Sequence, residues 1–418
     1  MSTDEVAARE KIRGRVLLVV VLTVFLDLVG FGITIPLMPF YVTKMVAPES
    51  VGLVTGLLIG SYSLAQALAS PVMGRLSDRY GRRAVILVSL AGNVASMIIF
   101  AFAAQSNALP LLFTSRLLAG ATAGNLGACQ AAIADVTDKS ERAAAMGKLG
   151  AGIGLGMVFG PFIGGQTEQI APWAPPVAAA SMAFLDLVLA ALLMPETRKI
   201  RTDKPGQGVG AAPATATGFL EVVKDQRILL SLLLYFLTFT SMTCLNVAFP
   251  LLSKDRFGWK GQQVGYMFAV FGVLGIVIQG FLMKPLARRF REVSMVMTVA
   301  VVLGAGMLVA AFSVAPWMLV LGNVLIGIAI SVNNPSISSI ASQNARSDQQ
   351  GAVLGYAQSA GSWARTIWPP IWGFLYGHLS PMAPFWGAAI SAFAMVFVAG
   401  MLRKEAPPPV SLRQGAAE

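Results

Sequence analysis

Gly74-Arg75-Leu76-Ser77-Asp78-Arg79-Tyr80-Gly81-Arg82-Arg83 lies between two long apolar stretches of the chain. Half of these residues carry ionisable Arg or Asp side chains, whereas charged residues make up only 12% of the whole sequence. A turn with so many charges cannot enter hydrocarbon, and short loops rich in Lys and Arg stay on the cytoplasmic side of a membrane. The stretch therefore predicts a membrane protein that keeps this loop in the cytoplasm.

The composition also indicates an integral membrane protein. Hydrophobic residues make up 56% of the 418-residue chain, and the mean hydropathy is +0.69, which is too apolar for a soluble domain. The net charge of +11 does not predict nucleic-acid binding, because the Lys and Arg residues lie in turns and tails and form no continuous stripe. Cys129 and Cys244 fall inside predicted membrane helices, and His378 is the single histidine, so neither a disulfide framework, a metal site nor an enzyme is expected.

Twelve apolar stretches are long enough, at about 20 residues, to span roughly 30 Å of hydrocarbon. They run approximately over 16–40, 50–72, 84–104, 109–135, 145–166, 173–194, 228–251, 262–283, 293–313, 316–341, 352–376 and 382–402. An even number of spans places both termini on one side, and most Lys and Arg residues lie in the termini and the even-numbered loops. Both termini are therefore predicted to be cytoplasmic.

A single long connection divides the predicted helices into six and six. It predicts a six-helix bundle over 1–197, a cytoplasmic linker with an interfacial helix over 198–227, and a second six-helix bundle over 228–418. The halves also resemble repeats, because a shift of 210 places 283–290 on 73–80. A parallel repeat of six helices with a site at the membrane midplane between the halves is one plan of secondary transporters.

Four ionisable residues are predicted to lie within the hydrocarbon: Asp27, Arg116, Asp186 and Arg365. Each costs on the order of 2.5–3.5 kcal/mol unless it is paired or hydrated. Asp27 lies roughly 18 Å from the cytoplasmic end of its helix and Arg116 roughly 12 Å from the outer end, so the two depths coincide. We expect an ion pair or a shared water cluster between them. Either this contact is static and structural, or the Asp27 carboxylate alternates between Arg116 and a proton.

The other two charges lack a partner at a matching depth. Arg365 requires a water-filled cavity, an anionic group of a substrate, or backbone carbonyl groups near Pro369 and Pro370. Asp186 lies roughly 20 Å from the outer end of its helix, and a structural or interhelical contact is expected for it.

Polar and aromatic residues inside the predicted helices are candidates for a roomy amphiphilic substrate cavity. Amides in membrane helices also join neighbouring helices, so a packing role stays open for each of them. The candidates for the cavity are Phe31, Thr34, Tyr62, Gln66, Gln130, Gln279, Asn333, Asn334, Gln358 and Arg365.

Four segments make the chain resemble the major facilitator superfamily, and within it the twelve-helix drug/proton antiporters, especially the group that contains tetracycline exporters. The decapeptide at 74–83 is similar to the signature of the loop between helices two and three, and 116–120 is similar to a fourth-helix arginine motif associated with proton coupling. The stretch 26–32, followed by Pro36 and Pro39, looks like the first-helix pattern. The fifth-helix antiporter motif is similar to the stretch that carries Gly156, Gly160, Pro161, Gly164 and Gly165.

The resemblance implies an all-α, polytopic protein with the major facilitator fold in a plasma membrane, such as the bacterial inner membrane. It implies proton-coupled export of a small amphiphilic or anionic compound by alternating access, as a monomer, with the proton gradient as energy source and without a bound cofactor. Tetracycline is not favoured as the cargo, because the acids of those exporters in the third and ninth helices have only uncharged candidates here, such as Asn93, Ser96 and Ser294. An uncoupled or proton-coupled transporter of an organic anion or sugar-like solute would keep the same fold.

The resemblance also implies that the loop signature acts as a cytoplasmic gate. Asp78 would meet the start of the eleventh helix near Gln350 and Gly351, where the helix dipole favours an anion. Arg79 would pair with Asp135 at the inner end of the fourth helix. The residues assigned to this gate are Gly74, Asp78, Arg79, Gly81, Arg82, Arg83 and Asp135.

Overall fold

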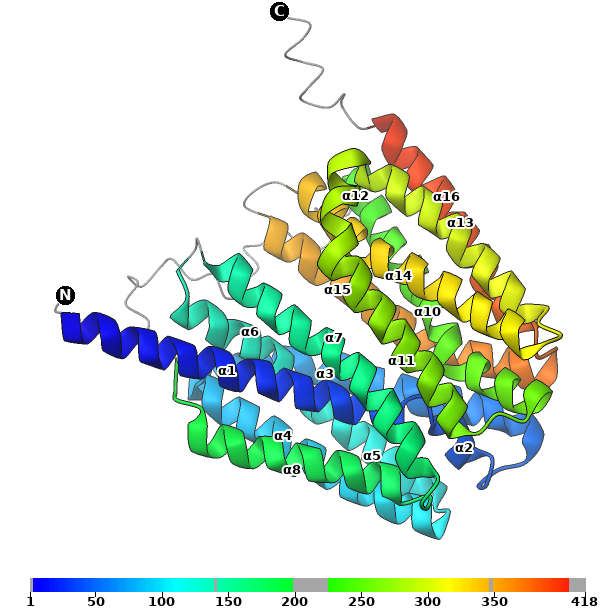
Figure 1. Cartoon of the computed structure of the whole chain (residues 1–418), viewed down its shortest axis with the longest axis horizontal. Helices are drawn as coiled ribbons and strands as arrows, with labels where there is room; N and C mark the ends of the chain where they lie inside the picture. The colour runs from blue at the N-terminus through cyan, green and yellow to red at the C-terminus, as the bar shows by residue number, and fades with distance from the viewer. Residues whose placement is uncertain (1–2, 139–140, 198–224, 346–348, 406–418) are drawn as a thin grey trace, which may run out of the picture.

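The computed structural model describes residues 3–138, 141–197, 225–345 and 349–405. These residues form α-helices joined by short connections, with no strands among them (Figure 1). Most of the predicted linker and its interfacial helix, 198–224, lies outside the described residues.

In the first half of the chain the described residues form eight α-helices. Their bounds are α1 Thr3–Thr34, α2 Met38–Val42, α3 Val51–Tyr80, α4 Arg82–Ser106, α5 Leu109–Thr122, α6 Asn125–Val136, α7 Arg142–Glu168 and α8 Ala174–Leu193. The second half has α10 Gln226–Phe257, α11 Gly261–Val277, α12 Met283–Arg289, α13 Glu292–Ala311, α14 Pro316–Asn344, α15 Gln350–His378 and α16 Ala383–Glu405.

Among the described residues, eleven helical segments are long and apolar enough to cross a membrane. α15 has 29 residues but is not one of these eleven. Three of the predicted spans are interrupted, and the first of them, 16–40, breaks at 35–37 between α1 and α2. The fourth breaks between α5 and α6, where a side chain on Gly124 would collide with Met73, and the eighth contains a π-helical segment, Ile278–Leu282, of a kind that is often functional.

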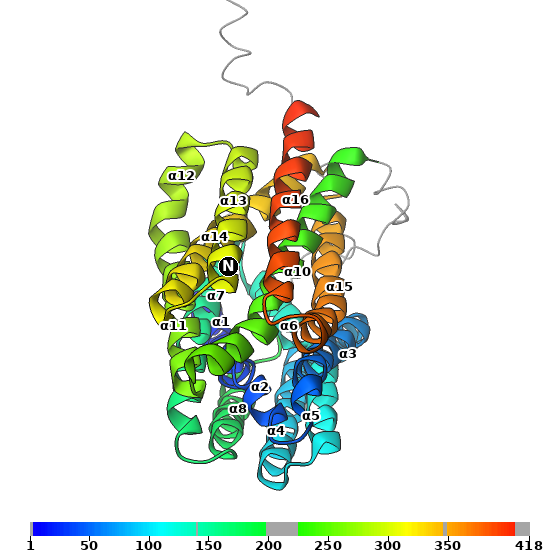
Figure 2. The same ribbon diagram turned by 90° about the vertical axis from the view of Figure 1, so that its right-hand side faces the viewer.

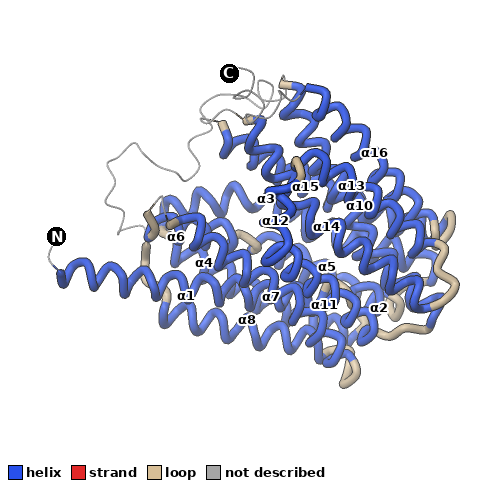
Figure 3. Tube along the Cα trace, turned by 45° about the horizontal axis from the view of Figure 1, so that its top comes forward, coloured by secondary structure: helices blue, strands red, loops and turns tan. Residues whose placement is uncertain are grey.

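The helices pack as two bundles that touch mainly through two helix pairs, α3 with α15 and α7 with α11. Figure 2 views the end at which these pairs meet. In Figures 1 and 3 the bundles diverge from there. The buried residues of α3 all lie within 51–63 apart from Ser77, so its second half is largely uncovered.

Glycines allow α3 and α15 to pack closely at the end where the two bundles touch. A methyl group added to Gly56 would collide with the backbone of Pro369, and one added to Gly52 would collide with the backbone of Gly373. At the end that carries the decapeptide loop, a methyl group on Gly74 or Gly355 would meet no atom within 4 Å. The structure is therefore closed at one end and open at the decapeptide end.

Candidate functional site

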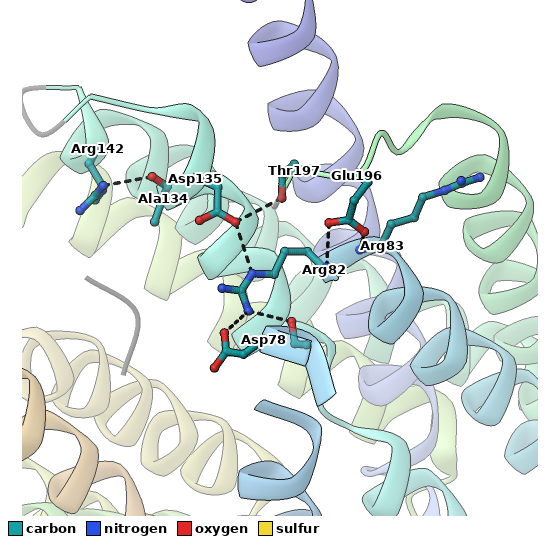
Figure 4. A network of polar contacts seen from close by, with 9 residues as sticks. Asp78, Arg82, Arg83, Ala134, Asp135, Arg142, Glu196 and Thr197 are labelled. Atoms are coloured by element: carbon teal, nitrogen blue, oxygen red, sulfur yellow. Dashed lines mark hydrogen bonds and ion pairs between the residues drawn. The ribbon is translucent and has the colours of Figure 1, made fainter. Parts of the chain in front are cut away.

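The decapeptide 74–83 is not a long turn, because 74–80 continue α3 and Gly81 alone separates them from α4. This stretch, still called the decapeptide loop, is held by Arg82, the first residue of α4 (Figure 4). Its Nη1 donates to Asp78 Oδ1 at 2.6 Å and to Ser77 Oγ at 3.0 Å. Its Nε donates to Asp135 Oδ2, on α6, at 3.3 Å, and the Thr197 hydroxyl donates to the same oxygen at 3.3 Å. The Arg82 side chain is 8% exposed and that of Asp135 10% exposed, so this pair is largely removed from water.

Glu196 secures the same turn from the segment that follows α8. Its carboxylate accepts the backbone N–H groups of Arg82 at 3.0 Å and Arg83 at 3.3 Å, which is favourable at the positive end of a helix dipole. Gly81 has φ 103°, and a side chain there would collide with Glu196. The sequence did not single out Glu196. The sequence feature that could have identified it is an acidic residue shortly after a predicted helix, at the cytoplasmic end that also carries the decapeptide.

The predicted Arg79–Asp135 pair, a contact of the closed cytoplasmic gate, is absent from the described ion pairs in this open conformation. Asp135 is engaged by Arg82, which starts α4 and faces α6, whereas the Arg79 guanidinium lies over the Tyr80 ring at 5.3 Å. The predicted contact of Asp78 falls on Gln350 and Gly351, whose side chains lie outside the described residues. Within them, Asp78 bonds to Arg82 and its side chain is 56% exposed.

Asp27 and Arg116 contact different levels of α4, and the predicted direct ion pair between them is absent from the described ion pairs. Asp27 Oδ1 accepts the Asn93 amide at 2.9 Å, and Asn125 lies beside the same carboxyl group. The residues that Arg116 contacts on α4 are four and seven positions beyond Asn93, which is roughly 6–10 Å along the helix. This offset separates the two charges.

Arg116 is 1% exposed and has aromatic surroundings. Its guanidinium lies 4.9 Å from the centre of the Phe100 ring, and Nη2 points at the Met97 sulfur at 3.9 Å. Tyr41 packs edge-on against Phe100 at 5.0 Å. Arg116 Nε and the Tyr41 hydroxyl have no hydrogen-bond partner, so this cation is held by an aromatic face, a favourable contact when desolvated.

Asp186 makes the interhelical contact expected for it. The Thr23 hydroxyl of α1 donates to Asp186 Oδ1 of α8 at 2.9 Å, and Asp186 is 1% exposed. Thr23 precedes Asp27 by four residues, so the two side chains share one face of α1.

Arg365 carries a charge without an ion pair among the described residues. Its Nη2 donates to Ser362 Oγ at 2.9 Å, and its guanidinium lies 4.5 Å from the centre of the Phe239 ring. The alternative in which it bonds to backbone carbonyl groups near the two prolines is not found. Next to it in α15, Trp368 stacks on Trp372 at 4.7 Å, and its indole N–H has no partner.

The other cavity candidates divide into three groups. Thr34 and Asn333 are wrong as lining residues in this conformation. Thr34 is 0% exposed and bonds to its own helix, and Asn333 is 1% exposed and donates to the Thr238 hydroxyl at 2.9 Å. Phe31 and Tyr62 pack against each other at 5.8 Å. The remaining candidates, all half-buried or exposed, are Gln66, Gln130, Gln279, Asn334 and Gln358.

The glycine motif of α7 forms packing faces. Side chains added at Gly156, Gly160 or Gly164 would collide with α1, and a side chain on Gly165 would press on Gln262 of α11. Gly265 of α11 abuts the carbonyl group of Pro161. Small residues thus let α7 approach a helix of its own bundle and a helix of the other bundle.

Comparison with known proteins points in one direction. The model of the Major Facilitator Superfamily matches residues 20–282 and 231–418. The class B tetracycline resistance protein of Escherichia coli is 30% identical over 364 residues, 86% of this chain and 88% of that protein. The crystal structure of a human organic anion transporter is 26% identical, with a TM-score of 0.68 and coverage of 93% and 99%. That of a D-xylose–proton symporter has a TM-score of 0.74 at 15% identity, covering 94% and 98%.

Proposed function

Because the chain belongs to the major facilitator superfamily, we propose that it is a proton-coupled exporter of a small amphiphilic compound. It is a multi-pass protein of a plasma membrane. In the proposed topology α15, the eleventh span in chain order, brings the number of membrane spans to twelve, and both termini are cytoplasmic. The proposal of proton coupling rests on one observation about Asp27. Its half-buried carboxyl group lies inside a membrane bundle and is held by the Asn93 amide, not by a cation.

The described conformation fits the loading step of such an exporter. With the decapeptide loop in the cytoplasm, the tight contacts of α3 with α15 and of α7 with α11 close the outer side. The open end then faces the cytoplasm, from which the compound enters. Release of a proton from Asp27 to the cytoplasm restores the charge next to Asn93 and lets the loaded bundles move toward the opposite opening, and a proton taken up on the outer side biases them back.

The cargo preference is proposed from Arg365. Its guanidinium is neutralised by no acid among the described residues, and an aromatic ring supports it. An amphiphile with an acidic group supplies the missing charge and an apolar body. The organic anion named for the human relative favours the same class. Transport of organic anions is therefore the second candidate function.

The test is an efflux assay with a panel of amphiphilic compounds in a drug-sensitive host, with and without an uncoupler. Asp27→Asn is expected to abolish efflux driven by a proton gradient in proteoliposomes. Glu49→Gln, which changes an exposed acid between α2 and α3, is the matched control and is expected to transport normally. Uncoupler-sensitive efflux that persists in Asp27→Asn would contradict proton coupling at this residue.

Arg365 is tested on the same panel. Arg365→Gln is expected to reduce efflux of acidic compounds by about tenfold or more, since a lost charged hydrogen bond is worth about 1.5–3 kcal/mol. Neutral and cationic compounds are expected to be affected far less. An equal loss of efflux for all compounds would indicate that Arg365 does not discriminate between cargoes by their charge.

A further inference from the structure

Asp186 is a buried carboxyl group that the proposed mechanism leaves without a task. It lies in α8 and is 1% exposed. Oδ1 accepts the Thr23 hydroxyl, whereas Oδ2 has no hydrogen-bond partner. No Lys or Arg forms an ion pair with it among the described residues. Among the described residues, the Thr23 hydroxyl is therefore the one hydrogen-bond donor to this carboxyl group, and it is neutral.

The surroundings favour the neutral form of Asp186. An ionised carboxylate in the interior of a protein costs several kcal/mol unless a cation or several donors compensate its charge. Arg116, the buried arginine of the same bundle, is instead engaged by Phe100 and Met97. A proton on Oδ2 removes the charge and leaves Oδ1 as the carbonyl oxygen that accepts from Thr23.

Asp186 is linked to Asp27 through α1. Thr23 and Asp27 are four residues apart on one helix face, and Asp27 lies near enough to Asp186 for an electrostatic interaction. Cys129 of α6 is the other titratable group that interacts with Asp186. The two acids differ in access, because Asp27 is half-buried and Asp186 is sealed.

We propose that Asp186 is a second proton-binding site of this transporter, coupled to Asp27 across one turn of α1. Two carboxyl groups that repel each other resist ionising together, so the pair gains and loses its protons in sequence. In the described conformation the sealed acid keeps its proton while Asp27 exchanges with the open side. The role of this proton in transport rests on the proposed function, but the protonation of Asp186 does not.

Infrared spectroscopy of the purified, lipid-reconstituted full chain tests the protonation without any cargo. At neutral pH Asp27→Asn, in which Asp27 cannot contribute, is expected to show the carbonyl stretch of a protonated carboxylic acid, and the double variant Asp27→Asn/Asp186→Asn is expected to lose it. Glu49→Gln, the exposed matched control, keeps the band. Thr23→Val keeps the acid but removes its donor, so the band persists and moves to higher frequency.

The coupling is tested by titrating the same band. Asp27→Asn is expected to retain the band and to shift the pH at which it disappears, because a charged neighbour has been removed. Absence of the band from Asp27→Asn, a band that survives in Asp27→Asn/Asp186→Asn, or a midpoint unchanged by Asp27→Asn would overturn the proposal. An ionised Asp186 would leave no acid band to titrate.

The consequence for transport is measured separately. If both acids take part, the protons released when the purified transporter binds its cargo are expected to fall about twofold in Asp186→Asn. Unchanged release, with the infrared band lost, would overturn the role in the cycle while leaving the protonation in place. Absence of release from the wild type itself would refute the proposed function and not the infrared result.

Discussion

Replacement of Arg82 by Gln is expected to destabilise the first bundle in a way that can be measured. The substitution removes a guanidinium that is shared by Asp78, Ser77 and Asp135. The contact with Asp78 adds little, at most about 1 kcal/mol, because that carboxylate is largely exposed. The contact with Asp135 matters more, since Asp135 is 10% exposed and would keep only the Thr197 hydroxyl. A lost charged hydrogen bond costs about 1.5–3 kcal/mol, so the sum is about 2–4 kcal/mol.

The assay is reversible unfolding in mixed detergent micelles, followed by tryptophan fluorescence. Arg82→Lys keeps the charge but not the planar fork that reaches two carboxylates, and it is expected to lose about half as much stability. Arg75→Gln removes the same charge from the same loop at an exposed position and is the matched control, expected within about 0.5 kcal/mol of the wild type.

A double-mutant cycle decides whether the Arg82–Asp135 contact is responsible. Arg82→Gln combined with Asp135→Asn is expected to show a coupling free energy of at least about 1 kcal/mol. Additive losses, or an equal loss in Arg75→Gln, would refute the reasoning and leave the loop as a topological marker without a stabilising network.

Three further predictions follow from other contacts. Gly56→Ala is expected to push α3 from Pro369 at the cost of about 1–3 kcal/mol; spin-label distances across the outer ends should lengthen, while Gly74→Ala, next to open space, leaves them unchanged. Trp372→Phe removes an indole donor 3.1 Å from the Thr240 carbonyl oxygen and is expected to cost about 1 kcal/mol or more in the unfolding assay; an unchanged stability would contradict this bond. Asn333→Leu should leave efflux within about twofold, because the amide joins α14 to α10; selective loss of one cargo would restore Asn333 to the cavity.

Hydrophobicity and charge along the sequence predicted the positions of membrane helices and of the charged residues buried within them. The predicted span 84–104 became α4 Arg82–Ser106, and 173–194 became α8 Ala174–Leu193. The interhelical contact of Asp186 also followed from its cost in hydrocarbon, although its partner Thr23 did not. A hydroxyl one turn before an acid carries no signal of which helix it faces.

The partners of the charged groups could not be predicted in the same way. Equal depth suggested that Asp27 would meet Arg116, but depth leaves the direction around the helix axis free. Asn93 and Phe100, both on α4, take one charge each. Likewise Arg79 was the predicted partner of Asp135. The start of α4 instead places Arg82 beside Asp135.

Hydrophobic length and the distribution of Lys and Arg therefore specify the helices of this chain, because transfer into hydrocarbon is a local property of each segment. Pairing is not local. Gly81 admits the Glu196 carboxylate only because the segment after α8 arrives there, and Gly52 meets Gly373 only in a conformation closed at one end. The loop at 74–83 can be read as a charged turn from its composition, but its role as the tie between α3, α4 and α6 arises from the packing of helices that are distant in sequence.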